Sequence, residues 1–373
     1  MRVSTGWWLM GQRPEFLFVT CQVGAERAVK FELAGRWPRF RPAFSRPGML
    51  TFKLPPDDRL VADFDLRSVF ARAYGFSLGV VSGSDMVRLA RAAWALYGGR
   101  PCRRIHVWPR DTAPPGDGGY EPGMTREARE AWGALHACCP RPGELAPDAD
   151  APDRPGRKGE FVLDCILVEP DQWCVGYHRV RDVSSQWPGG LIPLEPPPHA
   201  VSRAWLKMEE ALHWSGFPIT AGARCAELGS APGGSTQALL DRGCEVMGID
   251  PAEMHPAVLA HPCFTHVRAR VRQVRRRLFR RVRWLVADMN VAPRCTLDAL
   301  EDIVTHPEVN VRGIIAMLKL SQWAVAENLD RYLARVRSWG FNVVRARQLR
   351  YNRQEICFAA LKRPFVRRRY RWT

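Results

Sequence analysis

Six residues, Gly229-Ser230-Ala231-Pro232-Gly233-Gly234, form a turn whose composition could hold a nucleotide-like ligand. The turn follows an apolar run, Cys225–Leu228, that contains Glu227, and a second apolar run ends at Asp250. Glycines let the backbone turn tightly and approach a ligand where a Cβ would clash. Asp250 is placed to accept hydrogen bonds from two ribose hydroxyls. Because the turn reads G-x-x-P-G-G and not G-x-G-x-x-G, we predict S-adenosylmethionine as cofactor rather than NAD. The alternative is a glycine-rich turn without a ligand.

Four charged residues lie at predicted strand ends or on a nearby helix. Lys207 sits in SRAWLKMEE, Asp288 ends WLVAD, and Lys319 ends IIAMLK. Glu355 begins the last strand, EICFAAL. Strand ends converge on the ligand crevice of a doubly wound sheet. A lysine after so apolar a run requires partners, which Asp288 and Glu355 can supply. For each lysine taken singly, the alternative is an exposed surface charge.

The elements that position these residues alternate between helix and strand. We predict a helix over 202–214, capped by Ser202, before the glycine turn. Downstream we predict strands at 284–288, 313–320, 342–349 and 355–361, with a helix at 323–339. This alternation indicates an α/β fold, a Rossmann-like doubly wound sheet that ends in a hairpin.

The first half of the chain has a different pattern. A βαββ unit over 16–54 is followed by helices at 84–97 and 125–138 and strands at 104–108, 161–169 and 173–179, which indicates a mixed α+β region. The stretches 111–122 and 140–157 are rich in Pro, Gly and Asp and are interpreted as surface loops or disorder. A proline-rich linker ends near residue 198, so we predict domains 1–198 and 199–373.

The charge of the chain favours a polyanionic partner. Its 373 residues carry a net charge of +17, with a pI near 9.9, which favours nucleic acid over a membrane. A GC-rich genome would explain part of the arginine excess. The segment Arg268–Arg283 holds nine arginines, and we predict RNA contacts from Arg275, Arg276, Arg277 and Arg280. A solvated charged face is the alternative. The tail Arg367–Trp372, which interleaves arginine with aromatic residues, is a further candidate.

Cysteine usage and hydropathy limit the other classes. The eleven cysteines include no C-x-x-C pair, so we expect reduced thiols and no metal site. No apolar run reaches the length of a membrane span, and the N-terminus lacks a secretory apolar region. We therefore expect a cytoplasmic protein without a membrane partner.

The charged residues and their neighbours resemble the K-D-K-E tetrad of the FtsJ-like ribose 2′-O-methyltransferases. The resemblance is greatest to the RlmM-type branch, which methylates a cytidine 2′-hydroxyl in large-subunit ribosomal RNA. SRAWLKMEEA, ELGSAPGG, ADMN, MLKL and NRQEI occur in the order and at the spacing of that family. The resemblance covers about 160–363 well. It extends more weakly to the N-terminal part, which looks like the ferredoxin-like and THUMP-containing RNA-binding region of those enzymes.

The resemblance implies roles for the tetrad. It implies that Lys319 serves the ribose hydroxyl as base or as orienting group, and that Asp288 positions Lys319 and the methyl donor. Glu355 would hold Lys207 or the substrate ribose. The family carries a cofactor-binding acid near the place where this chain has Arg270. The alternatives are a methyltransferase acting on another RNA, a base or a small molecule, and a catalytically silent RNA-binding or ribosome-assembly factor.

Overall fold

The computed structural model describes residues 13–58 and 60–362, which belong to two compact units, Met1–Pro193 and Leu194–Thr373. The boundary lies slightly before the predicted position near residue 198. The Tyr351 hydroxyl donates a hydrogen bond to the Leu194 carbonyl over 3.0 Å. This contact attaches the end of the linker to the second unit.

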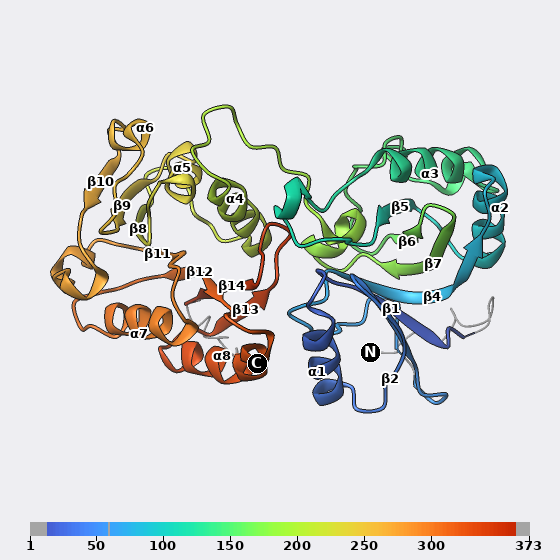
Figure 1. Cartoon of the computed structure of the whole chain (residues 1–373), viewed down its shortest axis with the longest axis horizontal. Coiled ribbons are helices and arrows are strands. Elements are labelled where there is room, and N and C mark those ends of the chain that lie inside the picture. The colour runs from blue at the N-terminus through green and yellow to red at the C-terminus, as the bar shows by residue number, and fades with distance from the viewer. Residues whose placement is uncertain (1–12, 59, 363–373) are drawn as a thin grey trace, which may run out of the picture. The chain divides into compact units, whose positions relative to one another are not determined.

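The first unit is built on a mixed seven-stranded sheet with the order β2-β3-β1-β4-β7-β6-β5 (Figure 1). Its strands are β1 (Phe16–Thr20), β2 (Arg41–Arg46), β3 (Met49–Lys53), β4 (Ala73–Ser82), β5 (Arg104–Pro109), β6 (Phe161–Glu169) and β7 (Gln172–Arg179). Its helices are α1 (Glu26–Arg36), α2 (Met86–Tyr97) and α3 (Arg126–Ala137). This arrangement confirms the α+β character predicted for the region.

The stretch 140–157 is a loop of the first unit that packs against the start of β5. The Ala146 amide donates to the Arg103 carbonyl over 2.9 Å, and the buried Arg104 guanidinium forms an ion pair of 2.6 Å with Asp148. Leu145 and Ala149 are also buried. Of the two interpretations given for this stretch, the structure supports the surface loop.

The second unit contains a seven-stranded sheet with the order β10-β9-β8-β11-β12-β14-β13. The strands are β8 (Arg224–Leu228), β9 (Glu245–Ile249), β10 (Phe264–Val267), β11 (Trp284–Ala287), β12 (Gly313–Lys319), β13 (Val343–Arg347) and β14 (Glu355–Leu361). Five of them, β8 to β12, pair in parallel, and β14 runs antiparallel between β12 and β13. The predicted Rossmann-like sheet with a terminal hairpin is confirmed.

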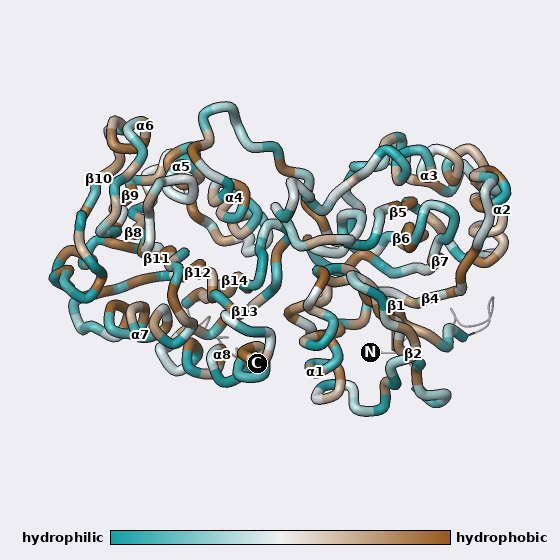
Figure 2. Tube along the Cα trace, viewed as in Figure 1, coloured by the Kyte–Doolittle hydropathy of each residue, from teal (hydrophilic) through white to brown (hydrophobic). Residues whose placement is uncertain are grey.

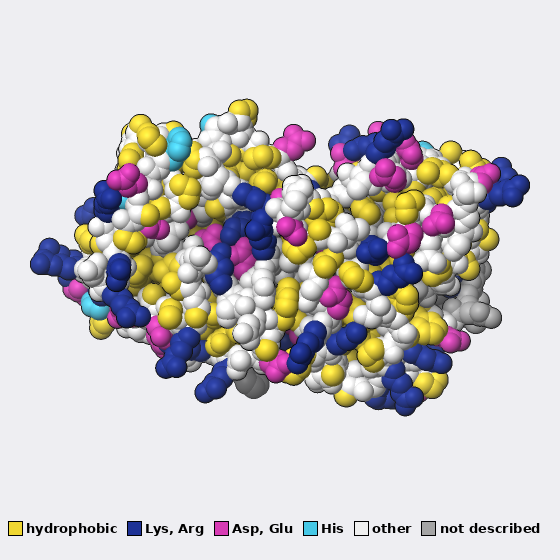
Figure 3. Space-filling model, viewed as in Figure 1, with side chains coloured by type: hydrophobic (Ala, Val, Ile, Leu, Met, Phe, Trp, Pro, Cys, Tyr) yellow, Lys and Arg dark blue, Asp and Glu magenta, His cyan; other side chains and the backbone are white. Residues whose placement is uncertain are grey.

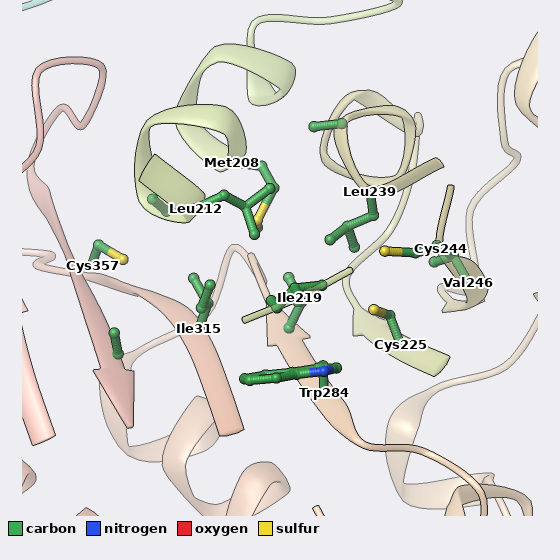
Figure 4. Close-up of a cluster of buried hydrophobic side chains, with 14 of the residues drawn as sticks. Met208, Leu212, Ile219, Cys225, Leu239, Cys244, Val246, Trp284, Ile315 and Cys357 are labelled. Carbon is green, nitrogen blue, oxygen red and sulfur yellow. The ribbon is translucent and has the colours of Figure 1, made fainter. Parts of the chain in front are cut away.

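Helices cover both faces of this second sheet. Figure 1 shows α4 (Ala204–Ser215) and α5 (Gly234–Asp241) on one face, and α7 (Pro293–Val304) and α8 (Leu329–Ser338) on the other. Hydrophobic residues concentrate along the strands and the inner helix faces (Figure 2). Under α4, Met208 and Leu212 pack with Leu239 of α5 above Ile315 and Trp284 (Figure 4). This core fixes α4, and with it Lys207, over the sheet.

Several boundaries differ from prediction. Helix α4 begins at Ala204 and its N-cap position is Arg203, so the predicted start and cap at Ser202 are wrong. The Ser202 hydroxyl still accepts a hydrogen bond of 3.3 Å from the Ala204 amide. The sequence analysis did not predict α6 (Pro256–Leu259), α7 or β10. The arginine-rich segment 268–283 contains two short 3₁₀ turns, Val271–Gln273 and Arg276–Phe279, and no α-helix. The tail candidate 367–372 lies outside the described residues.

Two further predictions concern thiols and membranes. All eleven cysteines fall within the described chain, and each is a free thiol. Within the same residues, no helix combines the length and the apolar character needed to cross a bilayer.

Candidate active site

The four tetrad residues form a closed ring of alternating charge. The Lys207 ammonium lies 2.7 Å from Asp288 and 2.9 Å from Glu355. The Lys319 ammonium lies 2.7 Å from the other Asp288 oxygen and also contacts the second Glu355 oxygen. The structure thus brings together all four residues that the sequence singled out.

The sheet register explains this convergence. Lys319 is the last residue of β12 and pairs across the strands with Glu355, the first residue of β14. Asp288 directly follows β11, which is the neighbour of β12 in the sheet. Lys207 reaches the ring from α4 above the sheet. Neighbouring strands lie about 4.8 Å apart, a distance that side chains of this length span easily.

Burial and charge act in opposite directions on the ring. Burial alone would raise the pKa of Asp288, but the ammonium groups of Lys207 and Lys319 outweigh it and lower that pKa. Burial alone would lower the pKa of Lys319, but Asp288 and Glu355 outweigh it and raise that pKa. Lys319 is therefore an ammonium ion in this arrangement, and it acts as a hydrogen-bond donor.

A cavity of about 540 Å³ opens onto the ring. Lys207, Lys319 and Glu355 line it, together with Arg203 and Arg353, two cations that the sequence analysis did not identify. Arg203 lies one helical turn before Lys207 in the chain, and Arg353 lies two residues before Glu355. Proximity to tetrad residues was the signal that could have found both.

Residues around Glu355 hold it in place. The Asn352 amide donates to a Glu355 oxygen over 3.3 Å. The buried Glu210 accepts hydrogen bonds from the Arg350 and Tyr351 amides at 2.9 and 3.1 Å, which fixes the turn before β14. Glu210 therefore has a structural role one turn along α4 from Lys207.

The glycine turn packs tightly between β8, Asp288 and α4. Gly229 has φ +80°, and a Cβ there would lie 2.9 Å from the Asp288 carbonyl oxygen. A Cβ at Gly234 would overlap the Ser202 hydroxyl and lie 2.9 Å from the Ser202 carbonyl. Only glycine fits these approaches, and Gly229 places the turn directly against the backbone of a tetrad residue.

Asp250 and Glu227 occupy different environments beside the turn. Asp250 follows β9, is half-buried, and accepts hydrogen bonds from the Ala231 amide at 3.1 Å and the Ala252 amide at 2.8 Å. Its carboxylate keeps lone pairs for further donors. Glu227 is fully buried and accepts a hydrogen bond from the Thr236 hydroxyl. Burial raises the pKa of Glu227 to about 8, which favours the protonated acid at neutral pH.

The other predicted cofactor residues lie around the same turn. Ser230 is buried, and its hydroxyl contacts the Met254 sulfur at 3.4 Å. Ala231 is half-buried, Pro232 is exposed and Gly233 is buried with φ +121°. A glycine surface next to a carboxylate that can accept two hydroxyl donors fits a nucleoside cofactor such as S-adenosylmethionine.

The arginine-rich segment is partly neutralised. Arg276 forms an ion pair with Asp302 and donates to two backbone carbonyls, and Arg280 forms an ion pair with Glu308. Arg275 and Arg277 are exposed. Arg270, near the position where the family carries an acid, is exposed beyond β10.

Most of the second unit is similar to a known protein family. Residues 200–345 match the family model described as FtsJ-like methyltransferase. This part of the chain is therefore similar to FtsJ-like methyltransferases. The matched residues include the glycine turn, Lys207, Asp288 and Lys319, whereas Glu355 lies beyond them.

Curated relatives bear the name ribosomal RNA large subunit methyltransferase M. The one from Halorhodospira halophila is 34% identical over 178 residues, which are 46% of this chain and 50% of the relative. The one from Marinobacter nauticus is 32% identical over 227 residues, which are 57% of this chain and 61% of the relative. The chain thus spans about half to three fifths of the length of these relatives. The resemblance seen in the sequence is confirmed.

Among solved structures, the chain is similar to the Methanococcus jannaschii fibrillarin pre-rRNA processing protein. The identity is 12% and the TM-score 0.35, over 54% of this chain and 82% of that one.

Proposed function

We propose that the chain is an S-adenosylmethionine-dependent RNA ribose 2′-O-methyltransferase, with a cytidine of large-subunit ribosomal RNA as its target. The observation that carries the proposal is the ring of Lys207, Asp288, Lys319 and Glu355 beside the glycine turn. The names of the curated relatives support large-subunit ribosomal RNA as substrate. A cytoplasmic location and RNA docking by the first unit belong to the same proposal.

The cofactor would lie along the glycine turn, with its ribose hydroxyls on Asp250. When bound, S-adenosylmethionine supplies an electrophilic sulfonium methyl group. The Gly229 backbone lies against the Asp288 carbonyl, so the turn and the charged ring belong to one rigid surface. This proximity favours in-line approach of a hydroxyl held by the ring.

Lys319 would orient the attacking hydroxyl. Two of its three N–H donors bind Asp288 and Glu355, which leaves the third for the ribose oxygen. Because its pKa is raised, we propose that Lys319 orients the hydroxyl as an ammonium ion and does not accept its proton, which leaves to water in the cavity as the oxygen–methyl bond forms. Asp288 and Glu355 hold both lysines in place, and the charges of the four ring residues cancel.

Arg203 and Arg353 would bind the phosphates that flank the target nucleotide. Both line the cavity at the ring, and Arg203 is anchored by a hydrogen bond of 3.2 Å to the Tyr351 carbonyl. Contacts with phosphates position an RNA strand without reading its sequence. Exposed Arg275 and Arg277 are proposed to add contacts outside the cavity.

The proposal is tested with labelled S-adenosylmethionine and a transcript of large-subunit ribosomal RNA. A 2′-O-methyl group prevents alkaline cleavage at that nucleotide, because the 2′-hydroxyl is the nucleophile in that cleavage. We expect label in alkali-resistant dinucleotides with the wild type and with Lys158→Ala, an exposed lysine of the first unit. Lys207→Ala should remove the label. Label in mononucleotides would indicate base methylation instead, and RNA binding without transfer would indicate a silent binding factor.

A further inference from the structure

Four neighbouring strands of the second sheet each place a cation at the edge opposite the tetrad. Arg224 begins β8, Arg283 precedes β11, Arg312 precedes β12 and Lys362 follows β14. The backbone ladder joins them in order. The amide of Arg283 donates to the carbonyl of Arg224 over 2.9 Å, Arg312 to Arg283 over 2.7 Å, and Lys362 to Arg312 over 2.9 Å. These four residues form a cation row.

The cation row borders a hollow of about 790 Å³. Arg280 and Arg281 line the same hollow, and its twelve lining residues include no Asp or Glu. Trp284 also lines it, with the Arg312 guanidinium 5.7 Å from the ring centroid. Figure 3 shows Lys and Arg side chains at many places on the visible surface, with Asp and Glu side chains near many of them. The hollow therefore differs from the ordinary surface by its single sign of charge.

Few of these cations are neutralised by the protein. Arg224 pairs with Glu245 at 3.0 Å, and Arg280 pairs with Glu308. In the described part of the chain, Arg281, Arg283, Arg312 and Lys362 have no carboxylate within ion-pair distance. Burial lowers the pKa of Lys362, which is the response of an ammonium group without a paired anion.

We propose that the cation row is a second RNA-docking site, which binds the sugar-phosphate backbone of the substrate away from the methylated nucleotide. The proposal rests on the RNA methyltransferase function proposed above. Adjacent strands lie about 4.8 Å apart, so the row extends about 14 Å. That length exceeds a single phosphate and suits consecutive phosphates of one strand. Arginine guanidinium groups match phosphate oxygens bidentately.

The row and the tetrad lie at opposite ends of the same strands. A strand of five residues such as β8 spans about 17 Å at roughly 3.3 Å per residue. One nucleotide cannot occupy both sites, so the row must contact a different part of the RNA. A long transcript should therefore bind more tightly than a short oligonucleotide that contains only the target nucleotide and its neighbours.

The test compares two double variants that each remove two positive charges. Arg283→Gln/Arg312→Gln changes the row, whereas Arg331→Gln/Arg337→Gln changes two exposed arginines of α8 and serves as control. The probe is a fluorescent transcript of large-subunit ribosomal RNA, titrated at several salt concentrations. Each lost phosphate contact lowers the slope of log K against log salt by about 0.7 to 0.9. We expect the row variant to lose about 1.4 to 1.8 from that slope and the control variant to keep it.

Further measurements separate the possible failures. Cofactor binding by calorimetry and the thermal midpoint should match the wild type in both double variants, which excludes misfolding. Lys319→Ala should keep the wild-type salt slope, because binding to the row does not require transfer. If the row variant keeps the wild-type salt slope and the protein still methylates the RNA, the docking role of the row is overturned and the proposed function stands. If the wild type does not methylate the RNA but the row variant still has a reduced salt slope, the proposed function is overturned and the row remains an RNA-docking site. If the row variant binds polyglutamate more weakly than the wild type but binds RNA equally well, the row belongs to an acidic protein partner and the proposal is overturned.

Discussion

Glu227 makes the stability of the second unit depend on pH. Its pKa rises from 4.5 to about 8 in the folded protein because the side chain is fully buried. Between these values the folded state holds a proton that the unfolded state has released, so stability falls as pH rises. Glu227→Gln removes this titration and keeps an acceptor for the Thr236 hydroxyl. At pH 5.5, one unit above the unfolded pKa, the wild type should already be about 1.4 kcal/mol less stable than the variant.

The expected magnitude follows from the two pKa values. From pH 5.5 to 7.5 the wild type should lose about 2.5 kcal/mol of unfolding free energy relative to Glu227→Gln, since one pKa unit corresponds to about 1.4 kcal/mol. Urea unfolding at pH 5.5, 6.5 and 7.5 measures the difference, and hydrogen exchange in β8 assigns the transition to the second unit. Glu245→Gln, which removes an exposed carboxylate from the neighbouring strand, is the matched control. A difference between Glu227→Gln and wild type that stays constant within about 0.5 kcal/mol would refute the burial argument.

Substitutions at three other residues test the cofactor turn and the ring. Asp250→Ala should weaken S-adenosylmethionine binding by about 1.5–3 kcal/mol, since it removes a charged acceptor; equal affinity by calorimetry would exclude Asp250 from the site. Lys319→Ala and Lys319→Arg should both abolish methyl transfer with cofactor affinity retained, and a single-turnover rate within about threefold of wild type would contradict the role of Lys319. Gly234→Ala should destabilise the second unit by about 1–3 kcal/mol, because its Cβ meets the Ser202 backbone; an unchanged thermal midpoint would contradict that packing.

The sequence was sufficient for the tetrad and for every strand of the second sheet except β10. The apolar runs before Asp288 and Lys319 identify buried parallel strands, and strand ends in such a sheet meet at one edge. These features depend on local pattern and on one topological rule, which is why they could be predicted. The exact Lys319–Glu355 pairing also requires β14 to lie between β12 and β13, which the sequence analysis did not predict.

The remaining features depend on three-dimensional arrangement. Arg224 and Lys362 lie far apart in the chain, and only the strand order places them in one row. The short 3₁₀ turns of the arginine-rich segment were hidden by its uniform charge, which shows no helical or strand period. The burial of Glu227 and the ion pair of Arg276 with Asp302 are likewise tertiary contacts without a local signal.

The pairing of Lys319 with Glu355 limits where the chain can gain or lose residues. Side chains alternate between the two faces of a sheet, so shifting β14 by one position against β12 would turn Glu355 to the wrong face. A single deletion inside β12 or β14 should therefore disable the ring even if the sheet still forms. The connections before and after α8, residues 321–328 and 339–342, lie outside the paired strands and carry no such register constraint. Natural insertions and deletions in this part of the chain are expected in those connections and not in the paired strands.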